Sequence, residues 1–366
     1  MKYQRLSSFF DSIQTKEQIL EQISMNPTLQ LQYNSWKPYQ QEAFINMCTG
    51  NQGVKLLYDS YFKEIFNPEY DPERLSHLLT VLLEKKVTIK MVLPNDSTRI
   101  GDETSLIITD IVVELEDQTI ANIEVQKIGY KFAGERASCY SADLLLRQYK
   151  RLKNQAKEHF SYKDIAPVYT IVFFESSPAI FNSYPDEYIH RFSTESNTGI
   201  CLNMLQNYIF IPVDIFLKKL HNEGIENELD AWLTFLGCDE PEYIIKLIEN
   251  YPYFKSLYAD LYDMCKNIER VMSMFSKELQ VLDRNTVKYM IDELQEELDD
   301  VIEKLDDANA QLNSTTEQLN TTTEQLNTTT EQLNTTTERL NNANQQLADK
   351  DAIIEKLQEE IKKLKG

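Results

Sequence analysis

Residues 109–126 read T-D-I-V-V-E-L-E-D-Q-T-I-A-N-I-E-V-Q. Both halves of this segment are rich in β-branched and apolar residues, so we expect two strands, over 109–115 and 119–126. Residues 116–118 are expected to form the tight turn between the strands. The segment therefore predicts a β-hairpin folded symmetrically about Asp117.

The two faces of this hairpin can be read from the sequence, because successive side chains of a strand point to opposite faces. One face is expected to be mostly apolar and directed to the core, with Ile111 opposite Ile123, Val113 opposite Ala121 and Leu115 opposite Thr119. The other face carries Asp110 opposite Glu124, and Gln126 lies two residues further along the same strand.

Asp110, Glu124 and Gln126 form the candidate catalytic set. Like charges on directly opposed strand residues are destabilising unless something bridges them, and a divalent cation with oxygen ligands is such a bridge. A bound cation would lower the pKa of its water and offset charge on a phosphoryl group. The pattern predicts Asp110 and Glu124 as metal ligands, with Mg²⁺ or another divalent cation as cofactor. The alternative is a solvated polar face of a surface hairpin.

A basic helix is expected after the hairpin, from about Ser138. Residues 127–163 contain nine Lys or Arg against three acidic residues, although the chain as a whole is acidic. A basic helix beside a metal site suits a phosphate backbone, whereas the alternative is a solvated helix face. The candidate nucleic-acid contacts are Lys127, Arg136, Arg147, Lys150, Arg151 and Lys153.

The order of the motifs resembles a known family. The motifs are Y-D-S-Y-F-K-E-I-F (58–66), the Asp110 strand, the E-V-Q strand (124–126), R-A-S-C-Y-S-A-D-L-L-L-R-Q-Y-K-R (136–151) and V-Y-T-I-V-F-F (168–174). This order is similar to that of the PD-(D/E)xK nuclease superfamily and, within it, of the bacterial recombination-promoting nuclease/putative transposase family.

The resemblance implies a restriction-endonuclease-like α/β core, a mixed sheet flanked by helices, and Mg²⁺-dependent cleavage of DNA. It places metal binding on Asp110 and Glu124, and it puts Gln126 in the position usually held by Lys. Gln carries no charge and cannot carry a proton near neutral pH, so a catalytically inactive nucleic-acid-binding protein is an alternative. Lys63, in the first of these motifs, could approach the site or lie on the surface.

The net charge of −21 over 366 residues argues against general affinity for nucleic acid. Much of the excess is local, because residues 283–310 carry ten acidic residues against three basic ones. Contact with DNA is therefore expected through a limited surface. The apolar runs are too short for a membrane span or a signal peptide, and the five scattered cysteines suit reduced thiols. We expect a cytoplasmic protein with no membrane partner.

We expect three domains: a nuclease-like domain over 1–224, a helical subdomain over 225–287 and a coiled coil over 288–366. The last contains S-T-T-E-Q-L-N (314–320), T-T-T-E-Q-L-N twice and T-T-T-E-R-L-N (335–341), with a leucine at every seventh residue. A period of seven predicts a left-handed coiled coil, most simply a parallel homodimer, whose Thr-rich centre is weak. The alternatives are a partly helical low-complexity tail, or a protein in which the coiled coil is the working part.

Overall fold

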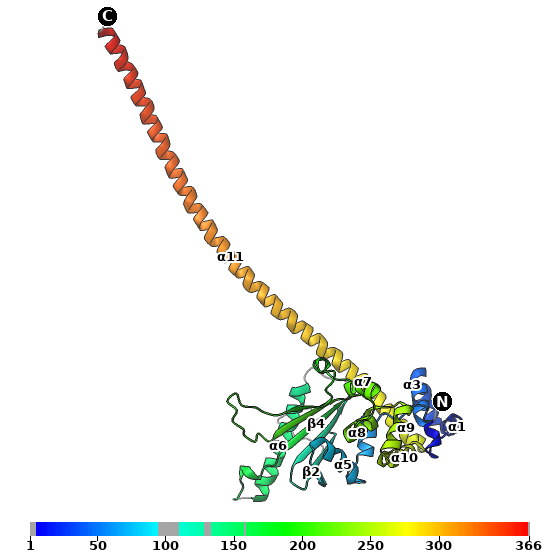
Figure 1. Cartoon of the computed structure of the whole chain (residues 1–366). Helices are drawn as coiled ribbons and strands as arrows, with labels where there is room; N and C mark the ends of the chain where they lie inside the picture. The colour runs from blue at the N-terminus through cyan, green and yellow to red at the C-terminus, as the bar shows by residue number, and fades with distance from the viewer. Residues whose placement is uncertain (1–4, 94–109, 128–132, 157–158, 365–366) are drawn as a thin grey trace. The chain divides into compact units, whose positions relative to one another are not determined.

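The computed structural model describes residues 5–93, 110–127, 133–156 and 159–364. The chain divides into two compact units, Met1–Met290 and Ile291–Gly366. The first unit contains a six-stranded mixed sheet with helices packed against it (Figure 1). The expected fold class is confirmed.

The predicted hairpin is present as β2 (Ile111–Leu115) and β3 (Ile120–Gln126), which pair antiparallel. Its register is the predicted one, because Ile111 lies opposite Ile123 and Val113 opposite Ala121. The turn closes where Gln118 adopts a φ of +69°. Asp110 comes directly before β2, and Thr109, the expected first strand residue, lies outside the described residues.

The sheet joins this hairpin to four further strands. They are β1 (Ile89–Val92), β4 (Val168–Phe174), β5 (His190–Phe192) and β6 (Gln206–Pro212), in the spatial order β1-β2-β3-β4-β6-β5. β3, β4 and β6 run parallel, whereas β1 and β5 are antiparallel to their neighbours. The crossover from β3 to β4 contains the long helix α6 (Ala133–Ala156).

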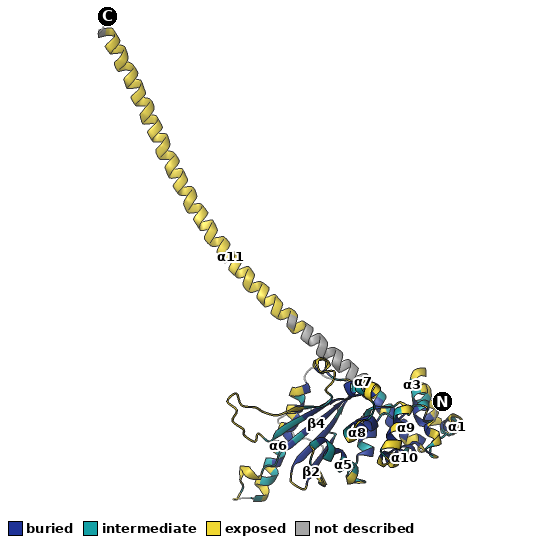
Figure 2. Ribbon diagram, in the orientation of Figure 1, coloured by how far each residue is buried: buried dark blue, intermediate teal, exposed yellow. Residues whose placement is uncertain are grey.

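Both faces of the hairpin are covered, which explains why every residue of β2 is buried (Figure 2). The odd-numbered residues, such as Val113 and Ile123, belong to the main hydrophobic core. The even-numbered Val112 and Ile120 instead pack with Leu144 of α6. The face that carries the candidate catalytic residues is therefore covered by α6, and the alternative of a solvated surface hairpin is wrong.

The remaining helices of the first unit surround the main core. That core extends from Leu6 to Phe275 and includes Trp232, so residues of both 1–224 and 225–287 contribute to it; the domain boundary at 224 stays a prediction. These helices are α1 (Lys16–Met25), α2 (Pro27–Ser35), α3 (Pro38–Cys48), α4 (Asp59–Ile65), α5 (Pro72–Leu83), α7 (Val213–Glu223), α8 (Glu228–Gly237), α9 (Pro241–Asn250), α10 (Tyr253–Cys265) and the 3₁₀ turns Leu6–Ser8, Tyr162–Asp164 and Ala179–Ser183.

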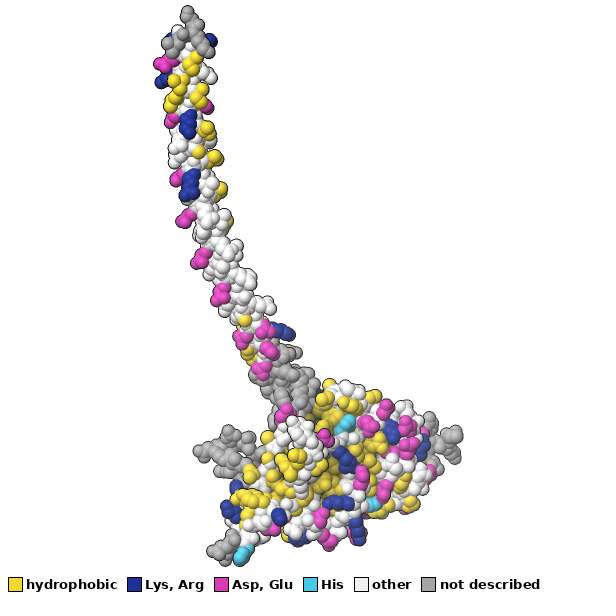
Figure 3. Space-filling view, turned by 60° about the vertical axis from the view of Figure 1, so that its left-hand side comes forward, with side chains coloured by type: hydrophobic (Ala, Val, Ile, Leu, Met, Phe, Trp, Pro, Cys, Tyr) yellow, Lys and Arg dark blue, Asp and Glu magenta, His cyan; other side chains and the backbone are white. Residues whose placement is uncertain are grey.

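The last helix, α11 (Ile268–Leu364), begins in the first unit and makes up the described part of the second. In the repeats the Thr hydroxyls donate to the carbonyl four residues earlier, as Thr329 does to Gln325 at 2.8 Å. The leucine row stays exposed, with Leu326 and Leu333 each 65% accessible. In Figure 3 the hydrophobic side chains of the outer part of this helix gather on one side. No described helix is long and apolar enough to cross a membrane.

Candidate active site

The carboxyl groups of Asp110 and Glu124 meet at the open end of the hairpin, where the sequence placed them. The Asp110 backbone N–H donates to Glu124 Oε1 at 3.3 Å. In return the Val125 N–H donates to Asp110 Oδ2 at 2.8 Å. Each carboxylate is thus held by the backbone of the opposite segment, which fixes their separation.

Glu124 is the more deeply buried acid of this pair. The residue is only 3% exposed, beneath α6. Burial, followed by the negative charge of Asp110, raises the pKa of Glu124 to about 8, while the positive charge of Arg136 acts in the opposite direction. A carboxyl group held in this way gains from any added cation, since a cation stabilises its ionised form.

Gln126 lies on the same face of β3 as Glu124, two residues further along the strand. It is 5% exposed, and its Oε1 has no hydrogen-bond partner among the described residues. A buried amide oxygen without a partner is energetically unfavourable unless a ligand, cation or water satisfies it. This oxygen is therefore a candidate metal ligand, together with the two carboxylates.

Lys63 places a positively charged side chain next to Asp110, whereas Gln126, in the position usually held by Lys, is uncharged. Its Nζ lies 3.0 Å from Asp110 Oδ1, although the two residues are far apart in the sequence. Both side chains keep some exposure, 34% for Lys63 and 14% for Asp110. Sequence reasoning left open whether Lys63 was a surface residue, because only its position within α4 was visible.

Arg136 and Tyr140, in the first turns of α6, also lie near Glu124. The Arg136 guanidinium lies 5.3 Å from the centre of the Tyr140 ring, and its charge acts on Glu124. Burial raises the pKa of Tyr140 to about 12, so its hydroxyl stays protonated at physiological pH and can donate a hydrogen bond. Arg136 was a predicted DNA contact, whereas Tyr140 was missed, because a helical tyrosine among apolar residues looks like a core residue.

Two other predicted DNA contacts are tied to buried acids of the fold. Arg147 pairs with Asp143 at 2.5 Å, and Arg151 pairs with Glu114 at 2.6 Å. These pairs offset the positive charge that α6 offers to a phosphate backbone. Lys150 and Lys153 are exposed on α6 and keep the expected placement.

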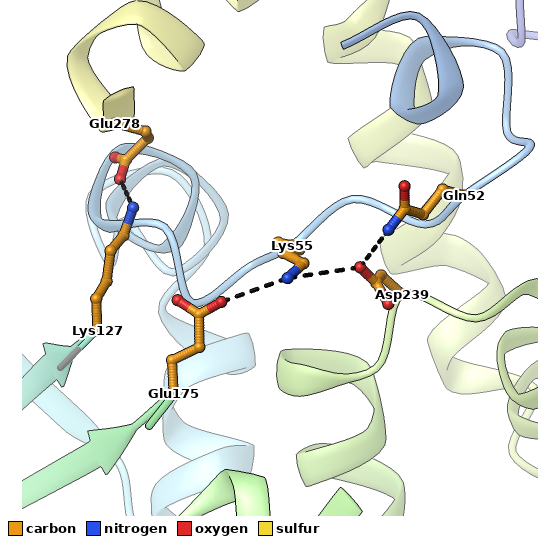
Figure 4. Close-up of polar contacts among 6 residues, drawn as sticks. All are labelled: Gln52, Lys55, Lys127, Glu175, Asp239 and Glu278. Carbon is orange, nitrogen blue, oxygen red and sulfur yellow. Dashed lines mark hydrogen bonds and ion pairs between the residues drawn. The ribbon is translucent and has the colours of Figure 1, made fainter. Parts of the chain in front are cut away.

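Lys127, one of the predicted DNA contacts, lies in the interior, where it is not accessible to DNA. Its side chain is 4% exposed and forms an ion pair with the equally buried Glu278 of α11 (Figure 4). Its Nζ also lies 3.8 Å from the centre of the Tyr58 ring. The sequence showed Lys127 at the start of a basic segment, but its partner is distant in the chain.

The donor set at this site consists of oxygen atoms only. Asp110 and Glu124 offer carboxylates and Gln126 offers an amide oxygen, which is the ligand chemistry of Mg²⁺ rather than of zinc. Across the described ranges, no group of three or more His, Cys, Asp or Glu side chains is placed to hold a metal ion. The residues present fit a hard divalent cation held by few protein ligands, as is usual for Mg²⁺.

Comparison with known families identifies the same region. A family model described as PD-(D/E)XK nuclease family transposase matches residues 56–293, more than half of the chain. The match includes Lys63, Asp110, Glu124, Gln126 and Arg136. Neither a curated protein nor a solved structure matches the chain.

Proposed function

Because this chain belongs to the PD-(D/E)XK nuclease family transposases, we propose that it is an Mg²⁺-dependent DNA endonuclease whose centre is Asp110, Glu124, Gln126 and Lys63. PD-(D/E)XK nucleases generally use divalent metal ions. The observation that carries the proposal is the pair formed by the buried Glu124 and the partly buried Asp110, with Lys63 Nζ 3.0 Å from Asp110. Buried acids with a perturbed pKa and a specific charged neighbour cluster at functional sites.

In this proposal Asp110 and Glu124 hold the cation, and Gln126 Oε1 contributes a further oxygen. A bound divalent cation would polarise the scissile phosphate and lower the pKa of an attacking water. The hydrogen bonds between Asp110, Glu124 and the backbone keep both carboxylates in place before DNA arrives. This preorganisation means that little rearrangement is needed during reaction.

Lys63 takes the part that a Lys in the E-x-K motif would have. Its ammonium group is next to Asp110 and partly exposed, so it can reach a phosphate oxygen at the same edge. There it would stabilise the negative charge that develops during hydrolysis. Gln126 cannot do this, because its amide is neutral.

Arg136 and Tyr140 are proposed to bind the DNA strand next to the centre. An arginine can donate two parallel hydrogen bonds to a phosphate, and the protonated Tyr140 hydroxyl can donate one. Lys150 and Lys153 extend this surface along α6.

Exchanging both lysines for Gln should flatten the salt dependence of DNA binding by close to two units of log–log slope. An unchanged slope would exclude these two lysines as phosphate contacts.

The test of the proposal is cleavage of a supercoiled plasmid by the full-length protein. We expect nicking with MgCl₂, no nicking with EDTA, and none by Asp110→Asn in either condition. Thermal unfolding of Asp110→Asn shows whether the variant is folded. Equal nicking by the wild type and by folded Asp110→Asn would reject the proposed centre.

The second candidate is a DNA-binding protein without nuclease activity, which the uncharged Gln126 favours. It predicts DNA binding that depends on Arg136 and Lys150 but no cleavage with Mg²⁺ or Mn²⁺. A wild type that binds and does not cut would support this candidate. Cleavage abolished by Asp110→Asn would reject it.

We also propose that the tail associates as a parallel homodimer. The leucine row is exposed along the described helix, with Leu326 and Leu333 at 65%, and a single helix cannot bury such a row alone. Dimerisation would bring two nuclease units to one DNA.

A cytoplasmic location is part of the same proposal, since the cysteines of the described residues are free thiols.

Light scattering on the full-length chain tests the dimer. Leu326→Asp with Leu333→Asp should give monomers, because the charges fall within the expected seam. The matched control, Gln325→Asp with Gln332→Asp, adds the same charges one residue earlier and should stay dimeric. A monomeric wild type at tens of micromolar, roughly the affinity of a weak coiled coil, would reject the dimer.

A further inference from the structure

The first part of α11, which we call the root (residues 268–280), is built into the first unit. Val271 and Met272 are fully buried, and Phe275 is 4% exposed. Ser276 accepts hydrogen bonds from Gln32 Nε2 at 2.6 Å and from Trp36 Nε1 at 3.2 Å. The root is therefore a fixed part of the main hydrophobic core of the first unit.

Glu278 is the one charged residue of the root that is buried, at 1% exposure. Its two carboxylate oxygens contact two different elements. Oε1 accepts the Ser60 backbone N–H at 2.8 Å, and Oε2 pairs with the Lys127 ammonium group (Figure 4). An N–H in the first turn of a helix lacks an acceptor within that helix, so Glu278 satisfies a group of α4 that would otherwise be unpaired.

Both contacted elements carry a residue of the proposed centre. Ser60 is three residues before Lys63 in α4, and Lys63 contacts Asp110. Lys127 directly follows Gln126, at the end of the strand that also carries Glu124. One buried carboxylate thus joins the helix that carries Lys63 to the end of the strand that carries Glu124 and Gln126.

We infer that Glu278 is a positioning residue for the nuclease centre, which it acts on through Ser60 and Lys127. This inference rests on the proposed function. Glu278 sets the distance between α4 and the end of β3, and so the position of Lys63 relative to Asp110 and Glu124. Misplacement of reacting groups by about 1 Å can reduce a rate by about 100-fold, so a remote carboxylate can govern turnover.

Neighbouring contacts provide matched controls. Arg270 of the root also contacts α4, through an ion pair with Glu64, but it is half-exposed, and among the described residues its ion pair does not involve β3. Lys55 links Glu175, directly after β4, to Asp239 at 3.5 and 3.7 Å (Figure 4), and no residue of the proposed centre lies on β4. Arg270→Gln and Lys55→Gln therefore remove similar links without touching the one at Glu278.

The experiment measures steady-state cleavage of a fluorescent duplex oligonucleotide with MgCl₂, together with thermal unfolding. Glu278→Gln keeps an acceptor for Ser60 but leaves Lys127 without its counter-charge. We expect kcat to fall about 10- to 100-fold, with KM within about twofold of wild type, because positioning affects the reaction more than DNA binding. Both control variants should keep the wild-type kcat.

A buried lysine without a partner can unfold a protein, so a second variant carries the test in that case. Glu278→Gln with Lys127→Met removes both charges, and replacing a buried ion pair by apolar groups is often tolerated. Its kcat should stay low even if its melting temperature returns to that of the wild type, because the link to β3 is still missing.

Three results would overturn the inference. The first is a folded variant at Glu278 with wild-type kcat, and the second is an effect on KM alone. The third is an equal loss in the Arg270 or Lys55 control, which would mean general loosening. A wild type that does not cleave, like Asp110→Asn, would instead reject the proposed function, and the positioning role with it.

Discussion

The two ends of the β2–β3 hairpin each bury a glutamate on the face beneath α6, but the surrounding charges differ. Near the turn, Glu114 lies 2.8 Å from Lys90 and 2.6 Å from Arg151. Burial raises its pKa, but the hydrogen bonds from Lys90 and Arg151 outweigh burial, and the pKa is lowered.

At the open end, Glu124 lies beside a second carboxylate, and its pKa is raised to about 8, first by burial and then by Asp110. A buried carboxylate whose charge is already matched serves stability. One that faces a like charge is poised to bind a cation. On the proposed function, the end of the hairpin near Glu114 is the structural end and the end near Glu124 is the functional end.

The largest expected effect comes from exchanging the same residue type at both ends. Glu124→Gln should lower Mg²⁺-dependent cleavage by about 10³-fold or more, since a metal ligand contributes several kcal/mol to the transition state. Glu114→Gln should keep nearly full activity at 25 °C. Initial rates of plasmid nicking provide the comparison, and comparable losses in both variants would remove the distinction.

Two lysines that contact hairpin carboxylates provide the next comparison. Lys63→Met should lower kcat by about 100-fold, in line with the loss of one group that stabilises the transition state. Lys90→Met should cleave at the wild-type rate, because Lys90 forms its ion pair with Glu114, at the structural end. If Lys63→Met retains full kcat, Lys63 is simply a counter-charge for Asp110.

The alternation of apolar and polar residues predicted the hairpin and its register. A shift of the strand pairing by one residue would move Ile111, Val113 and Ile123 out of the core. It also placed Asp110 opposite Glu124. The covering of this face by α6 was not predicted, since alternation does not say whether a polar face meets water or another helix.

Long-range ion pairs account for the other differences. Lys127 and Arg151 look like free positive charges in a basic segment, but their partners, Glu278 and Glu114, lie elsewhere in the chain. The approach of Lys63 to Asp110 is of the same kind. Such contacts depend on how α4, α6 and α11 pack, which no short motif encodes.

Acid titration should reveal the structural end. The pKa of Glu114 is lower in the folded than in the unfolded chain, so its contribution is complete above the unfolded pKa of about 4.5 and is lost as pH falls through the folded value. Urea unfolding should show Glu114→Gln about 1–3 kcal/mol less stable than wild type at pH 7. The difference between the two proteins should shrink as the pH falls from 7 through the lowered pKa of folded Glu114, and a constant difference would contradict this role.

The smallest effect is expected from Gln126→Lys, which adds a charge at the functional end. The new ammonium group would lie near Glu124 and restore the commoner motif, so cleavage should be retained or rise by up to about tenfold. Cleavage kinetics with MgCl₂ measure this. A large loss would show that the amide oxygen itself is required and that Lys63 already fills the cationic role.

The threonine hydroxyls of α11 have a consequence for how this gene can change. In the repeats each threonine hydroxyl donates to the carbonyl four residues earlier, as Thr336 does to Gln332. The side-chain hydrogen bonds of a repeat therefore span only about one heptad. Slippage of the DNA strands during replication could then add or delete whole copies of the repeat without leaving a threonine hydroxyl that lacks a hydrogen-bond partner. Each event would change the helix by about 10 Å at 1.5 Å per residue and leave the leucine row in phase.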